Sequence, residues 1–124
     1  MASMFIDFTG GAPIKVSGIG TTVQSLPLSL DLGGSYRVLD LICSVYSIGA
    51  GGTTVATSIL TSPQNAIEVP QWPVLGTFSP INTADTSVRA TFTGALRFVR
   101  YSIAVTVAAG PAYVTINGYA RTSE

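Results

Sequence analysis

The chain offers few side chains able to carry out acid–base or metal chemistry. Its 124 residues include no histidine, which removes the most common general base and the most common metal ligand. Cys43 is the only cysteine, so an intramolecular disulfide and a cysteine-rich metal site are both excluded. A Ser-His-Asp or Cys-His catalytic site is therefore impossible. We expect no enzymatic activity, no bound metal and no cofactor.

Glycoside hydrolysis is the chemistry still open to such a chain, because it needs only two carboxylates brought together. The acidic residues are Asp7, Asp31, Asp40, Glu68, Asp85 and Glu124. Most of them fall in predicted turns or beside the chain ends. A meeting of Asp31 with Asp85 is conceivable, but their spacing favours solvated turn acids instead. An enzyme with an unusual carboxylate pair is the weakest of three function classes.

One residue suited to binding is the single tryptophan, Trp72, which lies between Pro70 and Pro73. An aromatic side chain in a stiff loop binds at low entropic cost, so Trp72 is a candidate anchor for a protein interface or a sugar. The alternative is a loop tryptophan that folds back and caps the domain.

Arginines form a second candidate binding feature. Arg97 and Arg100, joined by Arg89 and Arg121 from neighbouring strands, would make a small basic stripe facing a partner that bears carboxylates. Ordinary solvated strand arginines are the alternative interpretation.

The longest strand-like segment, residues 36–48, is apolar on both of its faces. Leu39, Leu41, Cys43 and Val45 alternate on one face, which we expect to be buried. A strand apolar on both sides either lies at the centre of a sandwich or packs against another subunit. Asp40 interrupts the second face and would need a partner such as an arginine or backbone N–H groups. The predicted interface residues here are Tyr36, Val38, Ile42 and Tyr46.

Alternation with period two recurs along the whole chain between clusters of glycine, proline, asparagine and serine, which predicts an all-β protein. Residues 22–32 predict an edge strand that buries Leu26, Leu28, Leu30 and Leu32. Residues 96–107 and 112–121 predict a final hairpin, and residues 62–86 a long proline-rich connection. About eight antiparallel strands predict a single jelly-roll-like β-sandwich over residues 1–124, with residues 1–12 as an N-terminal arm or an edge strand.

Composition bears on partners and location. Charged residues make up 10% of the chain, and six basic side chains balance six acidic ones, so attraction to nucleic acid is not expected. The 15 threonines and 13 serines suit exposed strand faces, and the low charge favours self-association. No basic leader or apolar run of about 20 residues is present, so we expect no membrane segment and synthesis in a cytoplasm.

The final third carries a resemblance. The segment LRFVRYSIAVTV at residues 96–107, a Gly-Pro turn, and YVTINGYA at residues 113–120 are similar to small β-sandwich virion proteins of tailed bacteriophages. The strand at residues 38–47 after a glycine-rich turn is also similar. This resemblance covers about half of the chain and implies a capsid decoration, or cement, protein. Such a protein is a multimer, often a trimer, that binds the outer head lattice and braces adjacent capsomers.

The leading expectation is thus a non-enzymatic structural virion protein on the capsid surface, made in the host cytoplasm. Its expected partners are the major capsid protein and further copies of itself, with a homotrimer favoured. The second class is a carbohydrate-binding or adhesin-type β-sandwich module that stacks sugars on Trp72 and on tyrosines.

Overall fold

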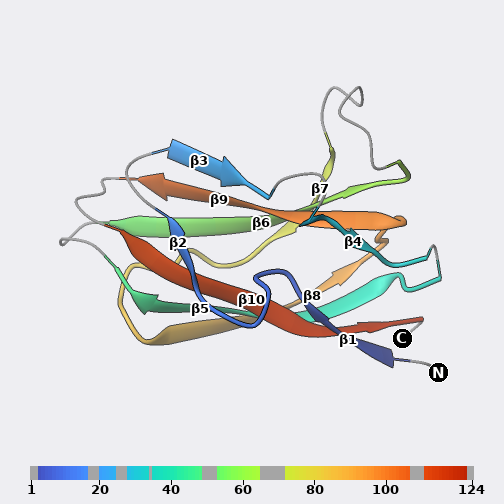
Figure 1. The fold of residues 1–124 in the computed structure, drawn as a ribbon, viewed down its shortest axis with the longest axis horizontal. Coiled ribbons are helices and arrows are strands. Elements are labelled where there is room, and N and C mark those ends of the chain that lie inside the picture. The colour runs from blue at the N-terminus through green and yellow to red at the C-terminus, as the bar shows by residue number, and fades with distance from the viewer. Residues whose placement is uncertain are drawn as a thin grey trace.

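The computed structural model describes residues 3–16, 20–24, 28–33, 35–48, 53–64, 72–106 and 111–122. These residues form ten strands in two layers (Figure 1). The strands are β1 (Ser3–Asp7), β2 (Ile14–Val16), β3 (Gly20–Val23), β4 (Leu30–Asp31), β5 (Val38–Ser47), β6 (Thr54–Ser62), β7 (Val74–Thr77), β8 (Thr86–Thr93), β9 (Phe98–Thr106) and β10 (Ala112–Arg121).

Every described pairing is antiparallel, and the pairings define two sheets. Sheet A has the order β1-β10-β5-β8, with β2 also on β10, and sheet B has the order β3-β9-β6-β7, with β4 also on β9. Taking β1 with β2 and β3 with β4 as two broken edge strands, this is the strand order of a jelly roll. The predicted all-β sandwich is confirmed, and the breaks explain why the strands outnumber the expected eight.

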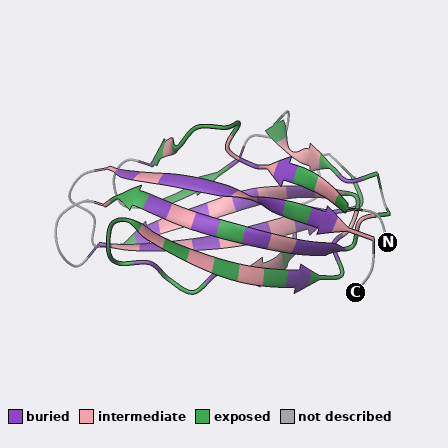
Figure 2. Cartoon of the chain, turned by 90° about the horizontal axis from the view of Figure 1, so that it is seen from below, coloured by how far each residue is buried: buried purple, intermediate pink, exposed green. Residues whose placement is uncertain are grey.

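Buried residues alternate with more exposed ones along the long strands (Figure 2). Alternate residues of a strand face the same side, so the buried set of each sheet fills the space between the two sheets. On β5 the inward set is the predicted Leu39, Leu41, Cys43 and Val45, all almost fully buried. On β9 the inward set is Val99, Tyr101, Ile103 and Val105, again as the alternation predicts. Both strands lie inside their sheets, which is why their alternation is so regular.

The last two strands do not form the predicted hairpin. Strand β9 lies in sheet B and β10 in sheet A, so the chain crosses from one layer to the other between them. Alternation reports which side chains face the core, but it does not report which sheet holds a strand. The β9 partners are β3, β4 and β6, whereas β10 pairs with β1, β2 and β5.

Residues 22–32 are not one continuous strand. They contribute the end of β3 and then β4, and Leu28 is 65% exposed although the pattern predicts it to be buried. Leu32 is buried as expected, and both strands lie at the edge of sheet B. Leu26 and Pro27 lie outside the described residues, as do Glu68, Val107 and Glu124. For the N-terminal segment, β1 is an edge strand on β10.

A buried glutamine holds the β3–β4 segment to both sheets. The Gln24 side chain donates to the carbonyls of Phe8 and Leu28 at 3.0 and 2.8 Å, and its amide oxygen accepts from the Tyr101 backbone at 3.2 Å. The hydrogen bonds to Phe8 and Tyr101 are buried, so each of them prevents an unsatisfied polar atom, and the one to Leu28 is partly buried. Gln24 thereby fixes the broken edge strand against β9.

Candidate functional site

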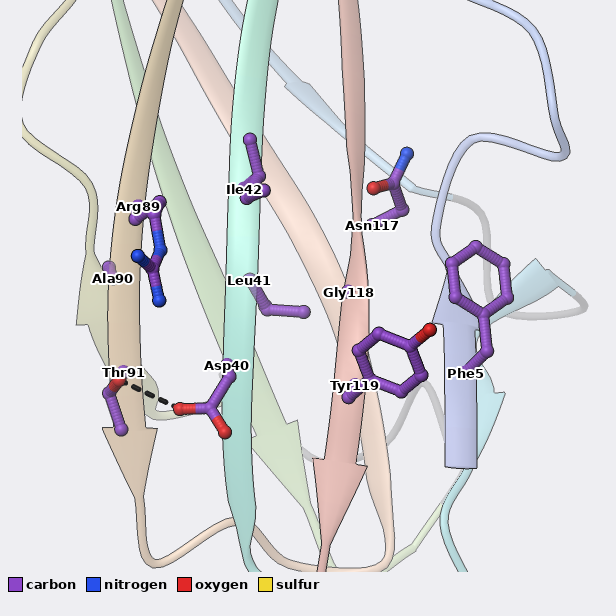
Figure 3. Close-up of a pocket in the computed structure, with 10 residues that line it drawn as sticks. All are labelled: Phe5, Asp40, Leu41, Ile42, Arg89, Ala90, Thr91, Asn117, Gly118 and Tyr119. Atoms are coloured by element: carbon purple, nitrogen blue, oxygen red, sulfur yellow. Dashed lines mark hydrogen bonds between the residues drawn. The ribbon is translucent and has the colours of Figure 1, made fainter. Parts of the chain in front are cut away.

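The outer face of sheet A carries a groove of about 580 Å³, shown in Figure 3. Strand pairing sets its side chains in two rows across the sheet. One row runs Phe5, Tyr119, Asp40 and Thr91, and the next includes Asn117, Ile42 and Arg89. Gly118 lies on β10 between Asn117 and Tyr119, but it faces inward and adds no side chain to the groove. Four strands, β1, β10, β5 and β8, therefore each contribute part of one surface.

An aromatic pair forms one wall of the groove. The Phe5 and Tyr119 rings meet edge to face, with centroids 5.7 Å apart and planes at 72°. Although they contact each other, Phe5 is 58% exposed and Tyr119 is 55% exposed. Together they present two aromatic rings to solvent side by side on neighbouring strands.

A carboxylate with two hydrogen-bond donors lies beside this wall. Asp40 accepts from Arg121 Nε at 2.6 Å and from Thr91 Oγ1 at 2.8 Å, the second of which is drawn in Figure 3. The hydrogen bond from Arg121, followed by that from Thr91, lowers the pKa of Asp40 below its usual value. The sequence-based requirement that Asp40 find a partner is confirmed, and the partner is Arg121.

This depressed pKa predicts a pH-dependent contribution to stability. A carboxylate with a lowered folded-state pKa stabilises the fold above its unfolded pKa, and the contribution is lost as pH falls through the folded value. We expect Asp40→Asn to cost about 1 kcal/mol at pH 7 and almost nothing once the pH is well below the usual aspartate value of about 3.9. Urea unfolding of both proteins at neutral and acidic pH measures the difference.

The matched control is Asp31→Asn. Asp31 pairs with Arg97 at 2.9 Å on the surface, and the Arg97 hydrogen bond lowers its pKa too, but both side chains are about half exposed. We expect a smaller effect from this control, because water and salt screen the pair. A loss of stability in Asp40→Asn that is equal at pH 7 and in acid would contradict a role for the Asp40 charge.

The remaining polar groups of the groove are Asn117 on β10 and Arg89 on β8 (Figure 3). Arg89 is exposed, and its charge contributes to the lowered pKa of Asp40 only after the groups that contact Asp40 directly. In the part of the chain that the structure describes, the arginines in salt bridges are Arg97 and Arg121, and Arg89 is in neither bridge. The groove thus combines aromatic, amide, carboxylate and guanidinium groups.

The outer face of sheet B is of a different kind. Strands β3, β6, β7 and β9 contain one charged residue, Arg100, and Asp31, paired with Arg97, lies beside them on the short edge strand β4. Ala56 pairs with Ala104, and Ser58 pairs with Ser102, on the two central strands. We call this surface the uncharged face, and its outward side chains are Thr21, Val23, Thr54, Ala56, Ser58, Ser102, Ala104 and Thr106.

Trp72 stacks against Arg100, the one charged residue of strands β3, β6, β7 and β9. It is 5% exposed, and the Arg100 guanidinium carbon lies 4.4 Å from the centroid of its ring. Arg100 also donates to the Gln24 carbonyl at 3.3 Å, and burial lowers its pKa. The interpretation of Trp72 as an exposed anchor is therefore wrong in this structure, because the loop residue folds back on Arg100 and caps the sheet.

The predicted interface residues of the 36–48 segment do not share one surface. Ile42 and Tyr46 point outward from β5 and are 38% and 48% exposed. Val38 shares the outward register of Asp40 and Ile42, but it is only 4% exposed and so is not accessible to a partner. Tyr36 is half-buried against the core. Ile42 lines the groove, and the Tyr46 hydroxyl lies 3.2 Å from Thr115 Oγ1 on β10.

The predicted basic stripe is not formed. Arg100 is on β9 in sheet B and Arg97 lies just before that strand, whereas Arg89 and Arg121 are on β8 and β10 in sheet A. Arg97 binds Asp31 and stacks on Phe98, Arg100 stacks on Trp72, and Arg121 binds Asp40. The stripe prediction treated the last two strands as neighbours, and they belong to different sheets.

Cys43 is fully buried, as its place in the apolar alternation predicts. Its thiol lies 3.5 Å from Thr57 Oγ1 in the core between the sheets, and burial raises its pKa. A thiol held protonated and away from solvent is a poor nucleophile.

Sequence reasoning did not single out Phe5, Asn117 and Tyr119 as site residues. Alternation does place Asn117 and Tyr119 on the outward side of the last strand, and this pattern is the one sequence feature that could have identified them as surface residues. What alternation lacks is the pairing of β10 with both β1 and β5, which sets Tyr119 between Phe5 and Asp40. The site depends on contacts between residues more than 70 positions apart.

The described residues lack two further features. They contain no group of three or more histidine, cysteine, aspartate or glutamate side chains placed to hold a metal ion. Within the same residues, no helix is long and apolar enough to span a bilayer.

Comparison with known proteins yields no match, either among protein-family models or among curated proteins. Function therefore has to be inferred from the geometry of the chain itself.

Proposed function

We propose that this protein is a non-enzymatic structural component of a virion, a capsid decoration protein that binds the outer head lattice as a trimer. The observation that carries the proposal is the uncharged face of sheet B. The surface formed by β3, β6, β7 and β9 includes one charged residue, Arg100, which stacks on Trp72, and the Asp31–Arg97 pair lies at its edge. Such a surface suits close packing against another protein, because charged residues are depleted in the centres of protein interfaces.

The size of the side chains supports the same use of this face. Ala56, Ala104, Ser58 and Ser102 keep the middle of the two central strands free of bulk, up to the Leu60–Arg100 pair, so a partner surface can approach the sheet closely there. Ordering such short side chains costs little conformational entropy when the face is covered. The jelly roll occurs in viral capsid domains among others, and the resemblance of the final third to phage virion proteins is in keeping with this use.

A trimer matches the symmetry of a head lattice. A head lattice offers three-fold and quasi-three-fold positions, and a protein of matching symmetry can occupy them with identical contacts. The major capsid protein is then the partner beneath the trimer, and the location is the outer surface of the virion.

The proposal predicts binding to capsids. Purified protein mixed with expanded, undecorated heads of the tailed phage that encodes it should cosediment with them and saturate at a fixed ratio to the major capsid protein. Heads already carrying their full decoration serve as the control and should bind no more. Absence of the protein from purified virions, as judged by mass spectrometry, would overturn the proposal.

A further inference from the structure

The groove on sheet A has features that protein packing does not explain. It lies on the opposite layer from the uncharged face, and its volume of about 580 Å³ falls within the range of small-ligand sites, roughly 300–1,000 Å³. Its aromatic wall is held in place, since Phe5 and Tyr119 come from paired strands and contact each other edge to face. The wall is thus available to a ligand without prior rearrangement.

The chemistry of the groove fits a sugar ring. A pyranose has C–H groups on its faces, which pack on aromatic rings, and hydroxyl groups around its rim, which both donate and accept hydrogen bonds. The Tyr119 ring offers the first kind of contact. Asn117 can donate and accept, and the Asp40 carboxylate retains acceptor positions beyond those used by Arg121 and Thr91. A purely apolar ligand would leave these polar groups without water or partner.

The charge in the groove points to the kind of sugar. The negative charge of Asp40 is already paired with Arg121. Arg89 belongs to neither described salt bridge, so it adds a net positive charge to the groove. The other acid near these rows is Asp7 on β1, which lies opposite Asn117 of β10. It is at the far end of that row from Arg89 and accepts hydrogen bonds from Thr9. A planar guanidinium donates two parallel hydrogen bonds to a carboxylate.

We infer that the sheet A groove is a binding site for a saccharide that carries a carboxylate, such as a sialic or uronic acid. The sugar ring packs on Tyr119 and Phe5, its hydroxyls bond to Asn117 and Asp40, and its carboxylate pairs with Arg89. This site takes the place of Trp72, one candidate for sugar stacking in the sequence, since Trp72 is buried. The inference does not depend on capsid binding, because it uses the other sheet of the sandwich.

The test uses matched soluble ligands and isothermal titration of the whole protein. The pairs are sialyllactose against lactose, and digalacturonate against the corresponding neutral galactose disaccharide. We expect at least one acidic ligand to bind, and its neutral counterpart to bind at least about tenfold more weakly, since a hydrogen bond to a charged group has that effect or more.

Variants locate the binding in the groove. Arg89→Gln should weaken the acidic ligand by about tenfold to a hundredfold, and Tyr119→Ala should weaken it by at least about tenfold, while Tyr119→Phe keeps the ring and most of the affinity. Arg37→Gln removes an exposed arginine outside the groove and should leave binding unchanged. Both arginines are exposed, so neither change should alter the urea midpoint.

Three results with saccharides would overturn the inference. These are no binding of any acidic ligand at millimolar concentration, equal binding of acidic and neutral partners, and equal losses in Arg89→Gln and Arg37→Gln. Tighter binding of an acidic peptide than of any saccharide would also overturn it, in favour of a protein ligand.

Discussion

Gly118→Ala is expected to leave the chain largely unfolded under conditions in which the wild-type protein is folded. A Cβ atom at this position would lie 2.1 Å from the Asp40 carbonyl oxygen and 2.9 Å from the Leu41 Cα, both in the backbone of the adjacent strand β5. The φ angle of +156° is also one that a side chain rarely permits.

The cost should be large, because the obstructing atoms belong to the backbone at the centre of sheet A and cannot rotate away. We expect a loss of more than about 4 kcal/mol, a large part of the roughly 5–15 kcal/mol that stabilises a small domain. Urea unfolding followed by near-ultraviolet circular dichroism measures it. The change would also remove the groove, since β5 and β10 supply its central residues.

Gly94→Ala is the control for this prediction. Gly94 also has a positive φ, +85°, but a Cβ there would have no atom within 4 Å. Its replacement should cost about 1 kcal/mol through backbone strain alone. Similar urea midpoints for the two variants would mean that β5 and β10 do not approach as closely at Gly118 as described.

Ala104→Glu is expected to abolish association of the protein with itself and with capsids while leaving the fold intact. Ala104 lies near the middle of the uncharged face, opposite Ala56 and Thr21, and its side chain points away from the core. A glutamate there is solvated in the free protein. Covered by a partner it becomes a buried, unpaired charge, which costs several kcal/mol, so we expect association to fall by about two to four orders of magnitude.

The measurement is light scattering of the purified variant, together with sedimentation of the variant with undecorated heads. Ser87→Glu is the matched control, because it places the same charge on an exposed strand residue on β8 in the other sheet. It should assemble as the wild-type chain does. Retained assembly of Ala104→Glu, or equal loss in both variants, would contradict the role given to sheet B.

The fold was largely predictable from the sequence because burial in a sandwich is encoded locally. Alternate residues along one strand face the same layer, so Leu39, Leu41, Cys43 and Val45 could be assigned to the core without knowing their neighbours. The same reasoning failed at Leu28, which follows the alternation but is exposed after the chain leaves β3. Local pattern cannot show where an edge strand is interrupted.

The candidate site was less predictable because it depends on strand order. Consecutive strands β9 and β10 appear as a hairpin in sequence, yet a jelly roll places them in different sheets. That crossing separates Arg97 and Arg100 from Arg121 and brings Arg121 instead to Asp40, 81 positions away in the chain. The prediction of Trp72 as an exposed anchor failed for a related reason, because its partner Arg100 comes from a strand distant in sequence.

The central claim is that the uncharged face of sheet B is covered by other subunits in the assembled state, and thiol labelling tests it most directly. The native Cys43 is buried, so an introduced cysteine at Ala104 or at Ser87 becomes the reactive one. With protein bound to heads, we predict that the Ala104→Cys thiol is protected from a maleimide and the Ser87→Cys thiol is labelled at the rate seen in free protein. Labelling of Ala104→Cys at its free rate in the bound state would contradict the account.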